Sequence, residues 1–338
     1  MLEKPNVPDD TLRACLRDHY GLHITQLAFL PIGNDVDTAV YRVVTDDATS
    51  YFLKLRSGRF DATTVAIPRF LHDQGITPIV APIETTAHHL WTRVGAFAVI
   101  LFPFVTGRDG FAAPLLERQW IELGVALKAM HTAVVPHALR PSIPQETYAP
   151  YWRDLVRTFQ ARVEATTFAD PVAAALAASL RANRGDISHI VARADALGDA
   201  LRARSPAPVL CHADIHGGNV LIGADQALSI VDWDTLTFAP KERDLMFGGG
   251  GVGGVWHDAQ EEAWFYQGYG RTEIDWRPLA YYRYERIVED IAAYGEQLLL
   301  TNEGGPDRAH GLCFFRAQFL PNNVVEIAYR TDRVLGES

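Results

Sequence analysis

Cysteine is scarce in this chain of 338 residues, which contains only Cys15, Cys211 and Cys313. The three lie far apart and form no C-x-x-C pair, so we expect neither a metal-thiolate centre nor a disulfide framework. A reducing compartment is the simpler assumption. We interpret Cys211 as a small core residue rather than a nucleophile.

Long apolar runs are also missing. No stretch reaches the length needed to span a bilayer, and residues 1–8 lack the apolar core of a signal peptide. We therefore expect a cytoplasmic protein. Nearly half of the residues (48%) are hydrophobic, which is enough for large cores and predicts two lobes or domains.

Positive charge is in deficit, with 31 Lys and Arg against 41 Asp and Glu and a net charge of -10. Nucleic acids and anionic membranes select basic surfaces, so we expect neither as a partner. An acidic protein suits a cationic small molecule instead. The sequence leaves the oligomeric state open.

Two short apolar runs, 209–211 and 220–222, bracket a polar loop that contains Asp214 and Asn219, and a third run ends at Asp232. In phosphoryl-transfer enzymes built in this way, the first Asp accepts the proton of the attacking hydroxyl, and the Asn and second Asp hold Mg²⁺. Asp and Asn are also common turn formers, so the short motif alone could arise by chance. The flanking strand pattern favours the functional interpretation.

At these residues the chain resembles the aminoglycoside phosphotransferase family, small-molecule kinases that share the protein-kinase fold. His212, Asp214, His216 and Asn219 fit the family's catalytic loop, and residues 231–234 fit its metal segment. The chain is similar in particular to members that phosphorylate the 9-hydroxyl of spectinomycin. That closer resemblance rests on residues 239–256, 281–291 and 322–328.

The resemblance implies an α+β, bilobal, protein-kinase-like fold. We expect a nucleotide-binding lobe over residues 1–102, a hinge over 103–107, and a larger, mainly helical catalytic and acceptor-binding lobe over 108–338. The first lobe should hold one helix over 61–74 and a five-stranded antiparallel sheet, its strands falling at 25–30, 39–44, 50–55, 79–83 and 97–102. Further helices are predicted at 9–19, 115–130, 151–164, 171–182, 186–201, 242–247, 258–269, 276–300 and 321–330.

The nucleotide site is expected in the first lobe. Lys54 shares a strand face with Phe52, where an unpaired charge is costly, so we predict that it binds the α- and β-phosphates of ATP. A lysine facing water on an edge strand is the alternative. Asp61 is the candidate acidic partner of Lys54, although it could equally cap the following helix. Further ATP contacts are expected from a turn and from the hinge, namely Gly33, Asn34, Asp35, Asp37, Thr38, Phe104 and Val105.

The acceptor site is harder to place. A protonated aminocyclitol needs carboxylates and an aromatic wall, and the candidates are Asp234, Trp256, Glu289 and Asp290. An internal salt-bridge ladder would explain the spacing of Arg286, Glu289 and Asp290 equally well. We expect Asp244, His212 and His216 to brace the catalytic loop. Residues 248–254, mostly glycine, are either a link between helices or backbone that a ligand approaches closely.

The sequence therefore predicts an ATP- and Mg²⁺-dependent O-phosphotransferase that acts on an aminocyclitol or aminoglycoside antibiotic and gives resistance to it. Two alternatives remain, namely a kinase for choline, a sugar derivative or another aminoglycoside, and a nucleotide-binding scaffold without turnover. A protein kinase is disfavoured because the loop lacks the H-R-D arginine and no Ala-Pro-Glu segment follows.

Overall fold

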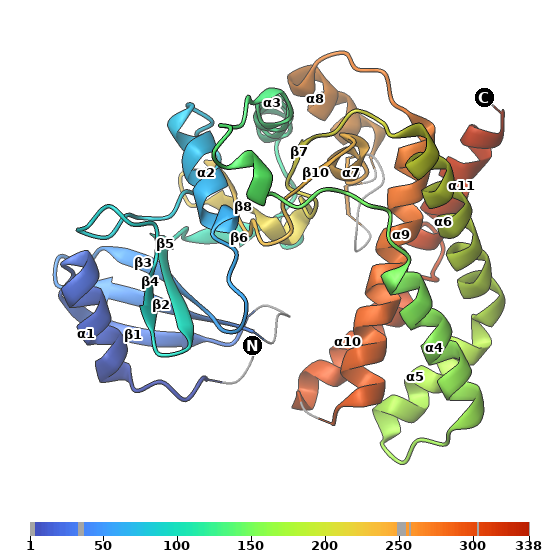
Figure 1. Cartoon of the computed structure of the whole chain (residues 1–338), viewed down its shortest axis with the longest axis horizontal. Coiled ribbons are helices and arrows are strands. Elements are labelled where there is room, and N and C mark those ends of the chain that lie inside the picture. The colour runs from blue at the N-terminus through green and yellow to red at the C-terminus, as the bar shows by residue number, and fades with distance from the viewer. Residues whose placement is uncertain (1–3, 33–36, 249–254, 257, 303, 338) are drawn as a thin grey trace. The chain divides into compact units, whose positions relative to one another are not determined.

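The computed structural model describes residues 4–32, 37–248, 255–256, 258–302 and 304–337 (Figure 1). The chain forms two compact units. The first comprises Met1–Ile143 and Gly218–Leu236, and the second comprises Pro144–Gly217 and Thr237–Ser338. These limits differ from those of the expected lobes, whose boundary at residues 103–107 stays a prediction.

A five-stranded antiparallel sheet forms the start of the first unit, as the sequence predicts. Its spatial order is β1-β2-β3-β5-β4. The strands are β1 (Ile24–Leu30), β2 (Thr38–Thr45), β3 (Ser50–Arg56), β4 (Thr92–Val94) and β5 (Phe97–Pro103).

The predicted strand over residues 79–83 is wrong, because β4 (Thr92–Val94) is the fifth strand. The backbone N–H of Val80 donates to the carbonyl of Ile230 at 3.1 Å, outside the five-stranded sheet. The N–H of Ile83 does donate to the carbonyl of Leu101 in β5 at 2.7 Å, but this bond does not extend into a ladder. Pro82 has no N–H to donate, so it could not take part in a regular ladder.

Helices pack on both faces of the sheet. Leu12 and Leu16 of α1 (Asp9–Tyr20) are buried against Leu53 and Leu55 of β3. The alternation along β3 turns Lys54 to the opposite face. There Val65 of α2 (Thr63–Asp73) packs near Ile100, which is the strand partner of Lys54.

The rest of the first unit includes a three-stranded sheet of order β6-β8-β9. Gly107 is required in β6, because a Cβ atom at this position would lie 2.0 Å from the carbonyl oxygen of Ile222. The strands pair so closely here that no other residue fits without displacing the backbone. The elements are β6 (Gly107–Asp109), β8 (Val220–Gly223), β9 (Leu228–Ile230), α3 (Glu117–Thr132) and η1 (Arg140–Ser142). A 3₁₀ turn, η2 (Gly217–Asn219), lies directly before β8, and its first residue belongs to the second unit.

The second unit is mainly helical, as predicted. Its helix α9 packs against α4, α6 and α11, and Figure 1 shows α11 running alongside it. A two-stranded sheet joins β7 to β10. The elements are α4 (Tyr151–Ala165), α5 (Pro171–Ala182), α6 (Arg184–Arg204), β7 (Val209–Cys211), β10 (Thr237–Ala239), α7 (Glu242–Leu245), α8 (Ala259–Tyr269), α9 (Trp276–Gly295), π-helical η3 (Glu296–Leu300), α10 (Gly305–Ala317) and α11 (Val324–Glu337).

Three helix predictions need correction in this unit. Helix α10 (Gly305–Ala317) was not predicted, and the last helix spans Val324–Glu337 rather than residues 321–330. The predicted helix over 276–300 ends as an α-helix at Gly295 and continues as one π-helical segment. Across the described part of the chain, the helices are too short or too polar for a membrane span.

Candidate active site

Lys54 is the centre of the charged cluster in the first unit. Its Nζ lies 3.1 Å from Oδ1 of Asp232 and 2.8 Å from Oδ2 of Asp234. Arg56, two residues further along β3, donates to the same Asp234 oxygen at 3.2 Å. The lysine side chain is only 14% exposed. The alternative of a lysine facing water is therefore wrong.

Charge pairing outweighs desolvation in this cluster. Burial alone lowers the pKa of Lys54, but Asp232 and Asp234 together raise it above the usual value. Burial raises the pKa of Asp234 as well, but Lys54 and Arg56 lower it by more than burial raises it, so the net shift is downward. The lysine is thus held charged on the inner face of β3, as a phosphate-binding group must be.

Asp61 is not the partner of Lys54. One of its carboxylate oxygens accepts from the backbone N–H of Thr63 at 2.9 Å and from the hydroxyl of Thr63 at 2.7 Å. The residue therefore makes the local turn that precedes α2, but the N-cap of this helix is Ala62, so the capping alternative is wrong as well. The carboxylates that contact the lysine come instead from the segment after β9.

Asn219 and Asp232 flank the hairpin formed by β8 and β9. The backbone N–H of Val231 donates to the carbonyl of Asn219 at 3.0 Å, which ties the two ends of the hairpin together. Asp232 adopts a left-handed backbone conformation with φ of 63°, an unfavourable one for a residue other than glycine. Its carboxylate is 51% exposed and already accepts a cation, Lys54. Together with the Asn219 amide it offers the oxygen ligands that Mg²⁺ prefers.

Four of the remaining predicted ATP contacts, Asp37, Thr38, Phe104 and Val105, lie within the residues that the structure describes. The side chain of Thr38 accepts from Arg56 at 2.8 Å, and Asp37 accepts from the hydroxyl of Ser57 at 3.0 Å. Phe104 is half-buried, with the Arg42 guanidinium 5.0 Å from its ring centre. Val105 is half-buried as well. Gly33, Asn34 and Asp35 lie outside the described residues, as do residues 249–254 of the glycine-rich segment.

Asp244 braces the start of the catalytic loop in the second unit. Its two carboxylate oxygens accept from the backbone N–H groups of His212 at 3.0 Å and Ala213 at 2.7 Å. Ala213 has a φ of 69°, so these bonds hold a strained conformation directly before Asp214. The predicted bracing role of Asp244 is confirmed.

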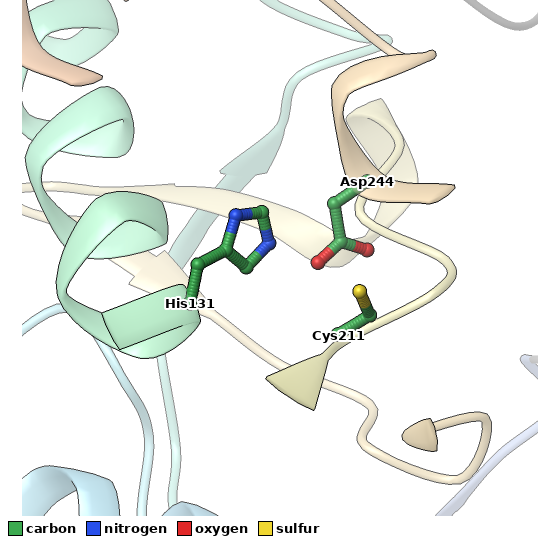
Figure 2. A group of neighbouring side chains, drawn as sticks. All are labelled: His131, Cys211 and Asp244. Atoms are coloured by element: carbon green, nitrogen blue, oxygen red, sulfur yellow. The ribbon is translucent and has the colours of Figure 1, made fainter. Parts of the chain in front are cut away.

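Cys211 ends β7 beside this brace, and Figure 2 shows the Asp244 carboxylate directed toward it. The thiol is fully buried, and burial, reinforced by the charge of Asp244, raises its pKa above the usual value. A thiol in this state is a poor nucleophile. The interpretation of Cys211 as a core residue is confirmed.

Asp214 is held by two basic side chains of the second unit. Nη1 of Arg286 donates to Asp214 Oδ1, and Nε2 of His216 lies 3.5 Å from Asp214 Oδ2. Burial alone would raise the pKa of Asp214, but the hydrogen bond from His216 and the charge of Arg286 bring it well below the usual range. The carboxylate is therefore ionised and able to accept a hydrogen bond from a hydroxyl.

A ladder of alternating charges continues from Asp214 along α9. Nε of Arg286 donates to Asp290 at 3.1 Å, and Arg243 lies 3.3 Å from Glu289. The salt-bridge ladder, which was the alternative interpretation of this helix face, is therefore present. The Glu289 and Asp290 side chains nevertheless remain about a quarter exposed, at 24% and 25%.

Burial raises the pKa of Asp290, and the neighbouring carboxylates Glu289 and Asp214 add to the rise against the opposing charge of Arg286. The cluster thus has more carboxylates than guanidinium groups to neutralise them. Trp256, a further acceptor candidate, is 5% exposed and adopts a φ of 63°. Asp234, the last candidate, is engaged by Lys54 and Arg56 as described above.

Sequence reasoning did not foresee two contacts of this site, the pairing of Lys54 with Asp234 and that of Asp214 with Arg286. Both join residues more than 70 positions apart. The spacing of Arg286, Glu289 and Asp290 along the sequence indicated a salt-bridge ladder on one helix face. It did not indicate that Arg286 also pairs with Asp214.

A charged lysine held by strand-end carboxylates, and a braced loop that presents an ionised Asp, define a phosphotransferase with a protein-kinase-like fold. The model of the phosphotransferase enzyme family (APH) matches residues 28–282, and the chain belongs to this family. It is an enzyme that transfers a phosphoryl group to a hydroxyl group.

Solved structures and a curated relative agree with this assignment. The chain is similar to spectinomycin phosphotransferase APH(9)-Ia, solved with ADP and spectinomycin, with 39% identity, a TM-score of 0.91, and coverage of 97% of this chain and 100% of that one. Protein StrN of Streptomyces griseus is 28% identical over 241 residues, which are 68% of this chain and 71% of StrN. An amicoumacin kinase shares the fold, with a TM-score of 0.61, 18% identity, and coverage of 96% and 94%.

Proposed function

We propose that this enzyme transfers the γ-phosphoryl group of ATP to a hydroxyl of an aminocyclitol antibiotic, with the 9-hydroxyl of spectinomycin as the acceptor. The observation that carries the proposal is the 39% identity to spectinomycin phosphotransferase, which extends over 97% of the chain. Inactivation of the antibiotic in the cytoplasm, where ATP is available, would give resistance.

The first unit supplies the nucleotide end of the reaction. Lys54 contacts the α- and β-phosphates. Its ammonium group exchanges its present partners, the carboxylates of Asp232 and Asp234, for phosphate oxygens. Asn219 and Asp232 would hold Mg²⁺, whose positive charge would be supplied to the phosphates. Asp37, Thr38, Phe104 and Val105 are proposed as further nucleotide contacts, as are Gly33, Asn34 and Asp35.

The second unit supplies the acceptor end. Asp214 accepts a hydrogen bond from the attacking hydroxyl, orients it, and takes its proton as the new O–P bond forms. The bond between the γ-phosphorus and its bridging oxygen breaks in the same step, and ADP leaves. The low pKa of Asp214 supports positioning as its main contribution, because a weak base removes a proton only late in the reaction. No covalent phosphoenzyme is involved.

A cationic acceptor fits the charges around Asp214. Glu289 and Asp290 are partly exposed carboxylates on the helix that also carries Arg286, and protonated amines of an aminocyclitol would pair with them. Trp256 and Asp234 are proposed as additional acceptor contacts. The raised pKa of Asp290 means that a bound ammonium group would stabilise its ionised form.

The test is ATP- and Mg²⁺-dependent ADP release by the purified protein, with spectinomycin, a panel of aminoglycosides and choline as acceptors. We expect spectinomycin alone to stimulate release, and NMR of the product to show the phosphate on the 9-hydroxyl. Stimulation by choline or by another aminoglycoside instead would refute the acceptor while keeping the reaction class.

The Asp214→Asn variant tests the role of this residue. We expect ADP binding by calorimetry to be unchanged and turnover to fall by about 10²–10⁴-fold, the usual contribution of a positioned acid or base. Asp199→Asn is the matched control, because Asp199 is 68% exposed and forms an ion pair with Arg202 in the next turn of its own helix. Wild-type turnover in Asp214→Asn would rule out the catalytic role.

A further inference from the structure

Helices α9 and α11 of the second unit, with the residues just before α11, line an open cavity of about 460 Å³. This volume is in the range of small-molecule sites. The side chains that line it belong to the segments Trp276–Arg283 and Asn322–Val334, and they include none of the residues described around Asp214.

Arg283 is a half-buried cation that lines this cavity. Its Nη1 donates to the hydroxyl of Thr331, a neutral group, and its Nε is buried without a hydrogen-bond partner. Among the described residues, no carboxylate lies within ion-pair distance of it. Burial outweighs the more distant charge of Glu262 and lowers the pKa of Arg283 to about 10.

A guanidinium nitrogen that is buried without a hydrogen-bond partner is costly, so folded proteins seldom retain one unless something else satisfies it. In the part of the chain that the structure describes, no residue forms an ion pair with Arg283, while the cavity leaves space for an anion beside the side chain. The cavity therefore has the electrostatic character of an anion site.

A second cation and an apolar wall define what would fit. Arg330 also lines the cavity, 48% exposed, and its nearest carboxylate, Glu326, lies at 4.0 Å. Trp276, Ile327 and Val334 provide apolar surface beside the two guanidinium groups. Paired guanidinium groups bind carboxylate and phosphate through several hydrogen bonds at once.

We propose that this cavity binds a small organic anion, whose carboxylate or phosphate group contacts Arg283 and Arg330 and whose apolar body packs on Trp276. The site is separate from the acceptor and nucleotide groups of the proposed reaction. It does not depend on the identity of the acceptor.

The experiment measures thermal unfolding of the full chain in increasing benzoate or increasing inorganic phosphate. A ligand that binds only the folded state raises the unfolding temperature with concentration. We expect at least one of the two anions to do so in the wild type, and the one that does identifies the head group. Arg330→Gln should weaken the apparent affinity about tenfold or more, since one charged hydrogen-bonding partner is lost.

Arg333→Gln is the matched control, because Arg333 is an exposed arginine of α11 that does not line the cavity. It should respond as the wild type does. Arg283→Met should abolish the response while leaving the unfolding temperature of the free protein equal or higher, because a nitrogen buried without a hydrogen-bond partner is removed. A merely structural arginine would instead lower it.

Lys54 is intact in all these variants, so phosphate binding at the nucleotide site is the same in each and cannot produce the differences. No anion-dependent stabilisation of the wild type would overturn the proposal. So would equal stabilisation of the wild type, Arg330→Gln and Arg283→Met. If Arg283→Met fails to fold, Arg330→Gln against Arg333→Gln still decides the outcome.

Discussion

Replacing Asp244 by Asn should damage both the stability of the second unit and the position of Asp214. In the wild type, the two carboxylate oxygens each accept a backbone N–H, from His212 at 3.0 Å and from Ala213 at 2.7 Å. An Asn side chain keeps one acceptor oxygen and places an NH₂ group where the other oxygen was. One buried N–H group would then face another donor.

The expected cost follows from these two bonds. Loss of one charge-assisted hydrogen bond costs about 1.5–3 kcal/mol, and a buried donor left unsatisfied costs about 1–3 kcal/mol. We therefore expect the free energy of unfolding to fall by about 3–5 kcal/mol. Ala213 would also relax from its φ of 69°, and a shift of about 1 Å in Asp214 would lower kcat about 10²-fold.

The assay combines urea unfolding with ADP-release kinetics on the same preparation. Asp199→Asn is again the control, and its free energy of unfolding should change by less than about 1 kcal/mol because its ion pair is exposed. ADP affinity should remain unchanged in Asp244→Asn, since Lys54 and its carboxylate partners are not touched. An Asp244→Asn protein with wild-type stability and wild-type kcat would refute the reasoning.

Three further predictions follow from other residues. Gly107→Ala should lower the free energy of unfolding by about 2 kcal/mol or more, because its Cβ would meet the backbone of Ile222. The control Gly185→Ala, with open space around it in α6, should not lower it. Equal urea midpoints for the two variants would contradict this prediction. Lys54→Met should reduce kcat/KM for ATP by about 10²–10³-fold in ADP-release assays, through the loss of its phosphate contacts; an unchanged value would exclude the phosphate role. Burial raises the pKa of Glu285 to about 8 from 4.5, so the folded state keeps a proton that the unfolded state has lost, and stability falls as the pH rises from about 4.5 to about 8. Glu285→Gln should remove this part of the decline, and identical pH profiles of the unfolding temperature would show that Glu285 is not its source.

Local patterns predicted most of the elements of the fold. Alternation along residues 50–55 identified β3 and the two faces of its side chains, because the period of a strand is visible in a few residues. The same method failed at residues 79–83, where an apolar run between prolines resembles a strand. It also failed at α10, whose Gly-Gly-Pro start resembles a loop.

Residue types on short loops predicted part of the candidate site, but pairings between distant segments were not predictable. The brace by Asp244 could be expected from the motif that contains it, whereas the partner of Lys54 could not. Asp61 was the nearest acidic candidate along the chain, and the structure uses Asp232 and Asp234, about 180 residues away. Which carboxylates pair with Lys54 depends on how β3 and the segment after β9 lie in the folded chain, and this cannot be inferred from positions along the sequence.

Helix α9 carries Arg283 on the cavity, Arg286 on the catalytic loop, and Glu289 and Asp290 in the charge ladder, all within eight residues. Each residue of an α-helix turns the next by about 100° and advances it by 1.5 Å. A single inserted or deleted residue between Arg283 and Arg286 would therefore rotate one group of contacts away while leaving the other in place. The length of this helix is accordingly as strictly constrained as the identity of its charged side chains, and natural variation in chain length should fall in the loops on either side of it.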